Sequence, residues 1–289
     1  MPSFEERRWR SRDGLSLFAR DYAGASGEAR LPVICLHGLT RNSKDFEEVA
    51  PIIAGWGRRV IVPDVRGRGR SDRDPNPRNY RPPIYARDVV EMMAALDVPR
   101  AVFLGTSMGG IITMTLMAVR PSAVAAAILN DVGPAIAPEG IARILDYAGK
   151  PVDVGSWEDA ADYVRRTNMA AFPDYGAEEW RRLADRTFRD ENGLPVLDYD
   201  PAIAVPLGKP PGKAALWVAA LLFRRLARKR PTLLIRGELS DIVTAEIAAR
   251  MKRTAPSLQT CVVPGVGHAP MLTEPVAVDA IRQFLRTNP

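Results

Sequence analysis

The sequence predicts a protein of the α/β class, in which a mostly parallel sheet is covered by helices on both faces. Two observations lead to this prediction. Short apolar runs alternate along the chain with segments of helical periodicity, and the runs are continuously apolar, as in strands buried on both faces. The runs lie at residues 33–36, 60–62, 101–104, 126–129 and 233–235.

The elements between and before these runs fit the same class. Helical periodicity is found at residues 46–54, 85–96 and 110–119. Two further runs, 4–10 and 15–22, precede the first buried strand and surround the dipeptide Asp13-Gly14. Because a glycine after aspartate favours a tight turn, we expect these two runs to form an antiparallel hairpin.

The alternation of apolar strand-like runs with helical segments stops between about residue 134 and residue 230. Here segments punctuated by proline and glycine carry helical patterns, such as 157–167 and 178–189, and we predict no strand among them. The sheet pattern resumes at Thr232. We therefore expect a helical cap at 134–230, inserted into a core domain made of residues 1–133 and 231–289.

Composition excludes few functions for this chain of 289 residues. Its formal charge is +6, but arginine is spread along the sequence and no nucleic-acid motif accompanies it, so we expect no nucleic-acid partner. No apolar stretch is long enough to span a bilayer, and we expect no stable membrane insertion. Two isolated cysteines and no secretory leader favour a cytoplasmic protein, while the oligomeric state is not predicted.

The sharpest local signal is the run Gly105-Thr106-Ser107-Met108-Gly109-Gly110, between an apolar strand and a helical segment. A serine flanked by glycines in a strand-turn-helix setting is typical of a nucleophile elbow. The helix that follows favours negative charge near its start. We therefore predict that Ser107 is a nucleophile, in preference to a serine that only caps a helix.

A serine hydroxyl needs a base that accepts its proton, and the chain has two histidines, His37 and His268. His268 lies in Gly265-Val266-Gly267-His268-Ala269-Pro270, in a loop that can reach the carboxyl edge of the sheet. No cluster of cysteine and histidine supports a metal, so we predict no metal site and assign His268 as the base.

The base needs a carboxylate that orients its ring, and three residues compete for this role. Asp241 follows the strand at 233–235 and is the preferred candidate. Asp131, which follows the strand ending near Asn130, is its rival because it also occupies a strand end. Glu238 is a third candidate.

With these motifs in this order, the chain resembles the α/β-hydrolase superfamily over nearly its whole length. The resemblance implies an eight-stranded, mostly parallel sheet and an inserted cap. It also implies that His37 and Gly38 begin the oxyanion loop and that the backbone N–H groups of Leu39 and Met108 form the oxyanion hole. The glycine- and arginine-rich run 64–72 matches a loop that has a mainly structural role in this family.

The function implied is hydrolysis of a carboxylic ester, lactone or thioester of a small-molecule substrate, without a cofactor. Carbon-carbon bond hydrolases of ring-fission diketones are similar at the elbow but commonly carry an aromatic residue after the histidine, where this chain has Ala269. A cofactor-free haloperoxidase or perhydrolase is another alternative on this scaffold. The non-enzymatic alternative is a small-molecule sensor.

Overall fold

Eight strands form one sheet in the order β1-β2-β4-β3-β5-β6-β9-β10. The structure is a computed structural model that describes residues 3–25, 30–207 and 212–288. β1 pairs antiparallel with β2, as the sequence predicts, and β2 pairs antiparallel with β4; the remaining neighbours are parallel. The strands are β1 Glu5–Arg10, β2 Ser16–Tyr22, β3 Val33–Leu36, β4 Val60–Asp64, β5 Ala101–Thr106, β6 Val124–Asn130, β9 Thr232–Gly237 and β10 Gln259–Val263.

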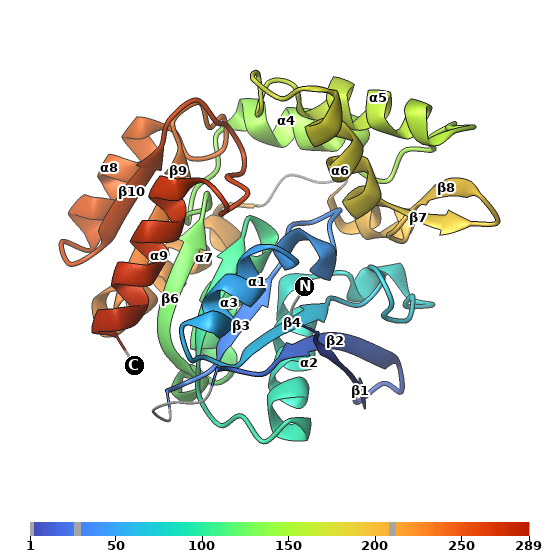
Figure 1. The fold of residues 1–289 in the computed structure, drawn as a ribbon. Coiled ribbons are helices and arrows are strands. Elements are labelled where there is room, and N and C mark those ends of the chain that lie inside the picture. The colour runs from blue at the N-terminus through green and yellow to red at the C-terminus, as the bar shows by residue number, and fades with distance from the viewer. Residues whose placement is uncertain (1–2, 26–29, 208–211, 289) are drawn as a thin grey trace.

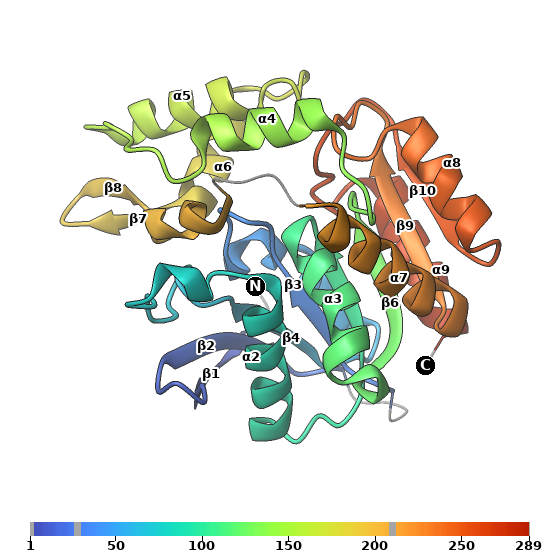
Figure 2. The ribbon, with the colours of Figure 1, turned by 180° about the vertical axis from the view of Figure 1, so that it is seen from behind.

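Helices cover both faces of this sheet, and each face has its own apolar cluster (Figures 1 and 2). One face packs on α1 and α9, the other on α2, α3, α7 and α8. Strands β3, β4 and β6 are buried along their whole length, which explains why their sequences are continuously apolar. The helices are α1 Val49–Gly55, α2 Pro82–Ala95, α3 Met108–Val119, α7 Lys213–Lys229, α8 Ala245–Thr254 and α9 Pro275–Thr287.

The segment between β6 and α7 lies over the carboxyl ends of the parallel strands (Figure 1). Buried side chains of residues 160–188 form a third apolar cluster, while Tyr199 and Ile203 belong to one of the two clusters of the core. Its elements are α4 Pro138–Tyr147, α5 Trp157–Asn168, α6 Ala177–Thr187, β7 Phe188–Glu191, β8 Leu194–Leu197 and the 3₁₀ helix η4 Pro201–Leu207.

Two features of residues 134–230 differ from the sequence-based description. The segment contains the hairpin β7–β8, which turns at Asn192 and Gly193, both with left-handed φ angles. Helix α7 lies beside α3 on the sheet (Figure 2), where Phe223 and Leu226 are buried, while Trp217 at its amino end is exposed. The elements that lie over the carboxyl edge of the sheet therefore end with η4, and α7 is not one of them.

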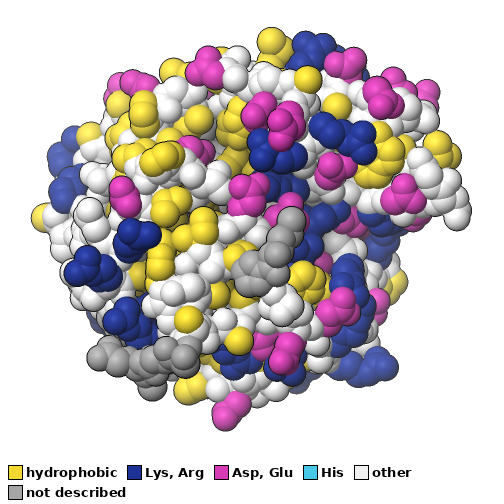
Figure 3. Space-filling view, viewed as in Figure 1, with side chains coloured by type: hydrophobic (Ala, Val, Ile, Leu, Met, Phe, Trp, Pro, Cys, Tyr) yellow, Lys and Arg dark blue, Asp and Glu magenta, His cyan; other side chains and the backbone are white. Residues whose placement is uncertain are grey.

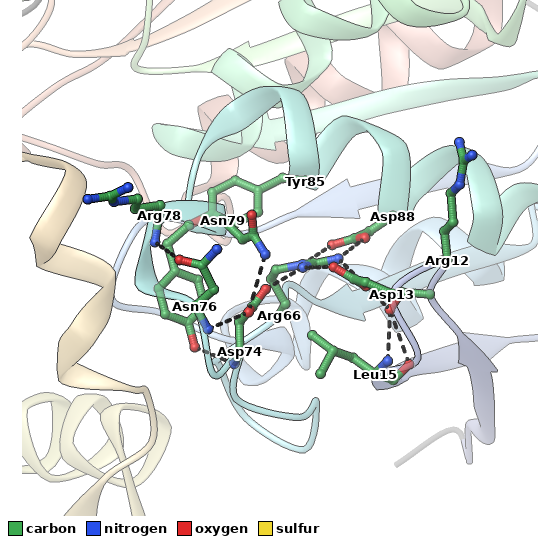
Figure 4. A network of polar contacts seen from close by, with 12 residues as sticks. Arg12, Asp13, Leu15, Arg66, Asp74, Asn76, Arg78, Asn79, Tyr85 and Asp88 are labelled. Carbon is green, nitrogen blue, oxygen red and sulfur yellow. Dashed lines mark hydrogen bonds and ion pairs between the residues drawn. The ribbon is translucent and has the colours of Figure 1, made fainter.

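The loop after β4 is held by a buried ion network. Arg66 is 1% exposed and bonds the carboxylates of Asp13, Asp74 and Asp88 (Figure 4). Hydrogen bonds from Arg66 lower the pKa of Asp13 to about 2. The network ties the β1–β2 turn and α2 to the loop, which supports the structural role that the family resemblance implies for residues 64–72.

Charges at the surface do not separate by sign on the face drawn in Figure 3, where arginine and lysine side chains are interspersed with aspartate and glutamate. No helix among the described residues is long and apolar enough to cross a membrane.

Candidate active site

Ser107 lies in a strained turn between β5 and α3. Its φ is +51°, in the left-handed region that non-glycine residues rarely adopt, and β5 ends immediately before it at Thr106. The turn is tight because a Cβ atom on Gly105 would lie 2.5 Å from the carbonyl carbon of Gly109. This geometry places the Ser107 side chain in the wall of a cavity at the carboxyl end of the sheet.

His268 connects Ser107 to a buried carboxylate. Its Nε2 lies 3.0 Å from Ser107 Oγ, and its Nδ1 lies 2.8 Å from Asp131 Oδ2. Because a carboxylate accepts hydrogen bonds, Asp131 favours the tautomer with the proton on Nδ1. That tautomer leaves Nε2 free to accept the hydroxyl proton of Ser107.

Asp131 is fully buried and held by two further donors. Ser240 Oγ donates to its Oδ2 at 2.6 Å, and the backbone N–H of Gly237 donates to its Oδ1 at 3.2 Å. The Ser240 hydroxyl itself accepts the backbone N–H groups of Ile242 and Val243. The sequence analysis did not single out Ser240, because a serine in a loop carries no distinguishing pattern.

The structure pairs His268 with Asp131 instead of Asp241, the carboxylate preferred from the sequence. The carboxylate of Asp241 forms two hydrogen bonds with the Arg143 guanidinium of α4, at 2.6 and 2.7 Å. Burial acts to raise the pKa of Asp241, but the hydrogen bonds and charge of Arg143, together with the charge of His268, lower the pKa overall. Asp131 takes the place beside His268 because it directly follows β6, the strand next to the one that ends before Ser107.

Glu238, the third candidate, lies apart from the histidine ring: its Oε2 accepts the backbone N–H of Gly265. This hydrogen bond connects the end of β9 to the loop that carries His268.

His37 shapes the loop on the other side of Ser107. Its Nε2 accepts the backbone N–H of Val65 at 3.0 Å, so the proton resides on Nδ1, which donates to the carbonyl of Gly38. Complete burial lowers the pKa of His37 to about 4. Among the described residues, the backbone N–H groups of Leu39 and Met108 have no hydrogen-bond partner.

Arg68 lies behind these two backbone groups. It is 1% exposed, yet no carboxylate pairs with it in the part of the chain that the structure describes. Its Nε donates to the carbonyl of Leu39 at 2.9 Å, and another guanidinium nitrogen lies 3.6 Å from Met108 Sδ. The rings of Tyr80 and Tyr85 lie within 6 Å of the guanidinium and help to compensate its burial.

The cavity that contains Ser107 and His268 extends between the core and α4, α5 and α6. Its walls combine apolar residues with a set of polar ones, so it can accept a substrate with both kinds of group. The aromatic residues of the segment above the sheet that line it are Tyr147, Tyr163, Phe172 and Tyr199. The polar lining residues include Thr40, Arg41, Asp45, Tyr147, Tyr163, Thr167, Asn168, Thr187 and Tyr199.

Comparison with known proteins identifies the family. The sequence profile of the alpha/beta hydrolase fold matches residues 32–275. The chain belongs to the α/β-hydrolase family. Among curated relatives of this α/β-hydrolase is a 3-hydroxybutyrate-oligomer hydrolase of Cupriavidus necator, 37% identical over 257 residues that cover 87% of each chain. A 2-(acetamidomethylene)succinate hydrolase of Mesorhizobium japonicum is 29% identical, covering 88% of this chain and 87% of its own.

Solved structures agree with this assignment. An α/β hydrolase from Novosphingobium aromaticivorans is 41% identical, covers 99% of both chains and superposes with a TM-score of 0.90. The fold predicted from the sequence is therefore confirmed, and the protein is an enzyme of the α/β-hydrolase family. No group of three or more potential metal ligands occurs within the described residues.

Proposed function

We propose that this α/β-hydrolase is a serine hydrolase that cleaves a carboxylic ester. One observation carries the proposal: the continuous hydrogen-bond chain from Ser107 through His268 to Asp131, with links of 3.0 and 2.8 Å. A serine becomes a competent nucleophile when a neutral imidazole accepts its proton and a buried carboxylate stabilises the resulting imidazolium.

In the proposed reaction, Ser107 Oγ attacks the acyl carbon while its proton passes to His268 Nε2. The carbonyl oxygen becomes negative and is held by the N–H groups of Leu39 and Met108, an interaction whose loss can cost roughly 3 kcal/mol per donor. The C–O bond then breaks, and His268 protonates the departing alcohol. Water repeats the sequence on the acyl-enzyme, releasing the acid and restoring Ser107.

The name of one relative supports a narrower proposal for the substrate class. The curated relative that is 37% identical is named for 3-hydroxybutyrate oligomers. An ester between short hydroxy acids carries apolar methyl groups and polar oxygens, which suits the mixed lining of the cavity. We infer that the substrate is a short ester of this chemical class.

The test compares the wild type with Ser107→Ala on the 3-hydroxybutyrate dimer and on p-nitrophenyl esters of increasing chain length. We expect sustained turnover that Ser107→Ala abolishes, with a preference for short acyl groups. Diketone cleavage, or halogenation and peracid formation with peroxide, without ester turnover would contradict the proposal. Ligand-dependent thermal stabilisation without any turnover would favour the sensor.

A further inference from the structure

Three side chains that can donate hydrogen bonds, those of Arg41, Tyr163 and Tyr199, line the active-site cavity. Arg41 follows the oxyanion loop, and a Cβ atom on Gly38 would lie 3.3 Å from Arg41 Cγ and 3.9 Å from Ser107 Cβ. The stem of Arg41 and the nucleophile therefore flank the same small space. Tyr163 of α5 and Tyr199 before η4 line the same cavity. We call Arg41, Tyr163 and Tyr199 the donor cluster.

Arg41 retains donors after its internal bonds are counted. Its Nε and one terminal nitrogen bond the carboxylate of Asp45, and the other terminal nitrogen donates to Thr187 Oγ1. A guanidinium has five N–H groups, so each terminal nitrogen keeps one N–H without a partner in the described chain. Both carboxylate oxygens of Asp45 accept from Arg41 and pair with its charge, and Thr187 donates its own proton to the carbonyl of Leu183.

Tyr199 has an unused hydroxyl proton. The side chain is 3% exposed, and its hydroxyl oxygen has no hydrogen-bond partner among the described residues. The backbone N–H of Gly149 lies nearby, but it is a donor and cannot accept that proton. A buried polar group without a partner is unfavourable in the folded state, and a ligand that supplies an acceptor here would relieve that cost.

The three side chains line the same cavity as Ser107 and His268. Tyr163 is near enough to Tyr199 and Tyr147 for their ionisation to raise its pKa, after the larger effect of burial. Tyr147 in turn is near Arg41, whose charge acts on its pKa. No hydrogen bond is formed by the Tyr163 hydroxyl within the described part of the chain. The cluster therefore contributes phenol and guanidinium donors to the lining of one cavity.

We propose that the donor cluster is a subsite for the free carboxylate of the substrate, so that the enzyme acts at the acid end of short hydroxy-acid esters. This assignment rests on the proposed function of Ser107. A carboxylate offers two oxygens with several acceptor positions, which can accept from the Arg41 guanidinium and from phenol hydroxyls.

The experiment uses two substrates with the same ester bond: the 3-hydroxybutyrate dimer as free acid and as its terminal amide. For the wild type, we expect kcat/KM to be at least about tenfold higher on the acid, since hydrogen bonds to charged groups are the stronger ones. Tyr199→Phe and Arg41→Gln should lower kcat/KM on the acid by about tenfold, mainly through KM, and change the amide little.

Tyr22→Phe is the matched control, because Tyr22 is buried in the opposite core cluster, outside the cavity. It should leave the preference for the acid unchanged. Equal turnover of acid and amide by the wild type, or equal losses on both in Tyr199→Phe, would overturn the subsite.

A binding measurement separates this proposal from the proposed function. In Ser107→Ala protein, which needs no turnover, 3-hydroxybutyrate should raise the thermal unfolding midpoint, whereas 3-hydroxybutyramide at the same concentration should not. The shift should be lost in Ser107→Ala/Tyr199→Phe. If wild-type protein fails to hydrolyse either dimer, the proposed function fails, and this shift alone then decides the subsite; its absence would overturn it.

Discussion

At the scale of single residues, Asp131 is the carboxylate whose loss should affect catalysis most. Asp131→Asn replaces an acceptor with an amide that can hold His268 in the wrong tautomer, so we expect kcat to fall by about 10⁴-fold. Steady-state kinetics on the preferred ester will measure this. Asp241→Asn should leave kcat nearly unchanged; the opposite ranking would contradict the assignment.

Arg68 should influence the oxyanion without touching it. Its guanidinium bonds the Leu39 carbonyl and contacts Met108, so Arg68→Met removes both an anchor and a positive charge behind the proposed oxyanion donors. We expect kcat to fall on the order of tenfold or more, with KM little changed. Arg70→Met, an exposed arginine on the same loop, is the control and should retain normal kcat.

Because His37 is buried in its neutral form, the folded protein should lose stability in mild acid. Its pKa is about 4 in the folded state and about 6.5 when unfolded, so between these values the unfolded chain binds a proton that the folded one excludes. Stability is therefore fully present above pH 6.5 and decreases as pH falls to 4, by roughly 3 kcal/mol for this group.

Urea unfolding at pH 7 and pH 5 will measure this dependence. His37→Gln should flatten it in that range, whereas His268→Gln should leave the slope caused by His37 in place. An unchanged slope in His37→Gln would exclude His37 as its source.

At the scale of elements, helix α4 is fixed to the core by contacts around Asp241. Arg143 pairs with the carboxylate of Asp241, and a Cβ atom on Gly140 would lie 2.5 Å from the carbonyl oxygen of Asp241. Since Ile144 and Tyr147 of this helix line the cavity, the pair positions part of the cavity wall.

We therefore expect Arg143→Gln and Asp241→Asn to raise KM while kcat changes little. The pair is partly exposed, so a double-mutant cycle on stability should give a coupling of about 1 kcal/mol or less. Additive effects of the two substitutions on KM would show that the ion pair does not position α4.

Elements with strong periodicity were predictable, and those without it were not. The buried strands and the helix after Ser107 follow from continuous apolar runs and a glycine-rich turn. The hairpin β7–β8 was not predicted because its first strand, Phe188–Glu191, is mostly charged; the dipeptide Asn192-Gly193 was the available signal. Helix α7 was assigned to the cap because its apolar pattern does not reveal which surface it packs on.

At the scale of the whole molecule, chain order placed Ser107 and His268 together, since both follow strands that end at one edge of the sheet. It could not choose between Asp131 and Asp241, because both follow neighbouring strands at that edge. In the structure Asp131 contacts His268, whereas Asp241 bonds Arg143, which lies in a different element. The sequence did not indicate the donor cluster either, because Arg41, Tyr163 and Tyr199 are far apart along the chain.

The separation of apolar clusters predicts how the molecule opens. Buried residues of α5 and α6 pack mainly on one another, in a cluster distinct from those around the sheet. Moving α5 and α6 therefore exposes little of the core, and we expect amides of α5 and α6 to exchange with solvent faster than those of β5 and β6. Because Tyr163 of α5 and Arg41 of the core line the same cavity, 3-hydroxybutyrate should slow exchange in α5 if it contacts both residues.

Hydrogen exchange monitored by mass spectrometry, with and without this ligand, will measure both effects. Equal protection of cap and sheet would show that they open as one unit.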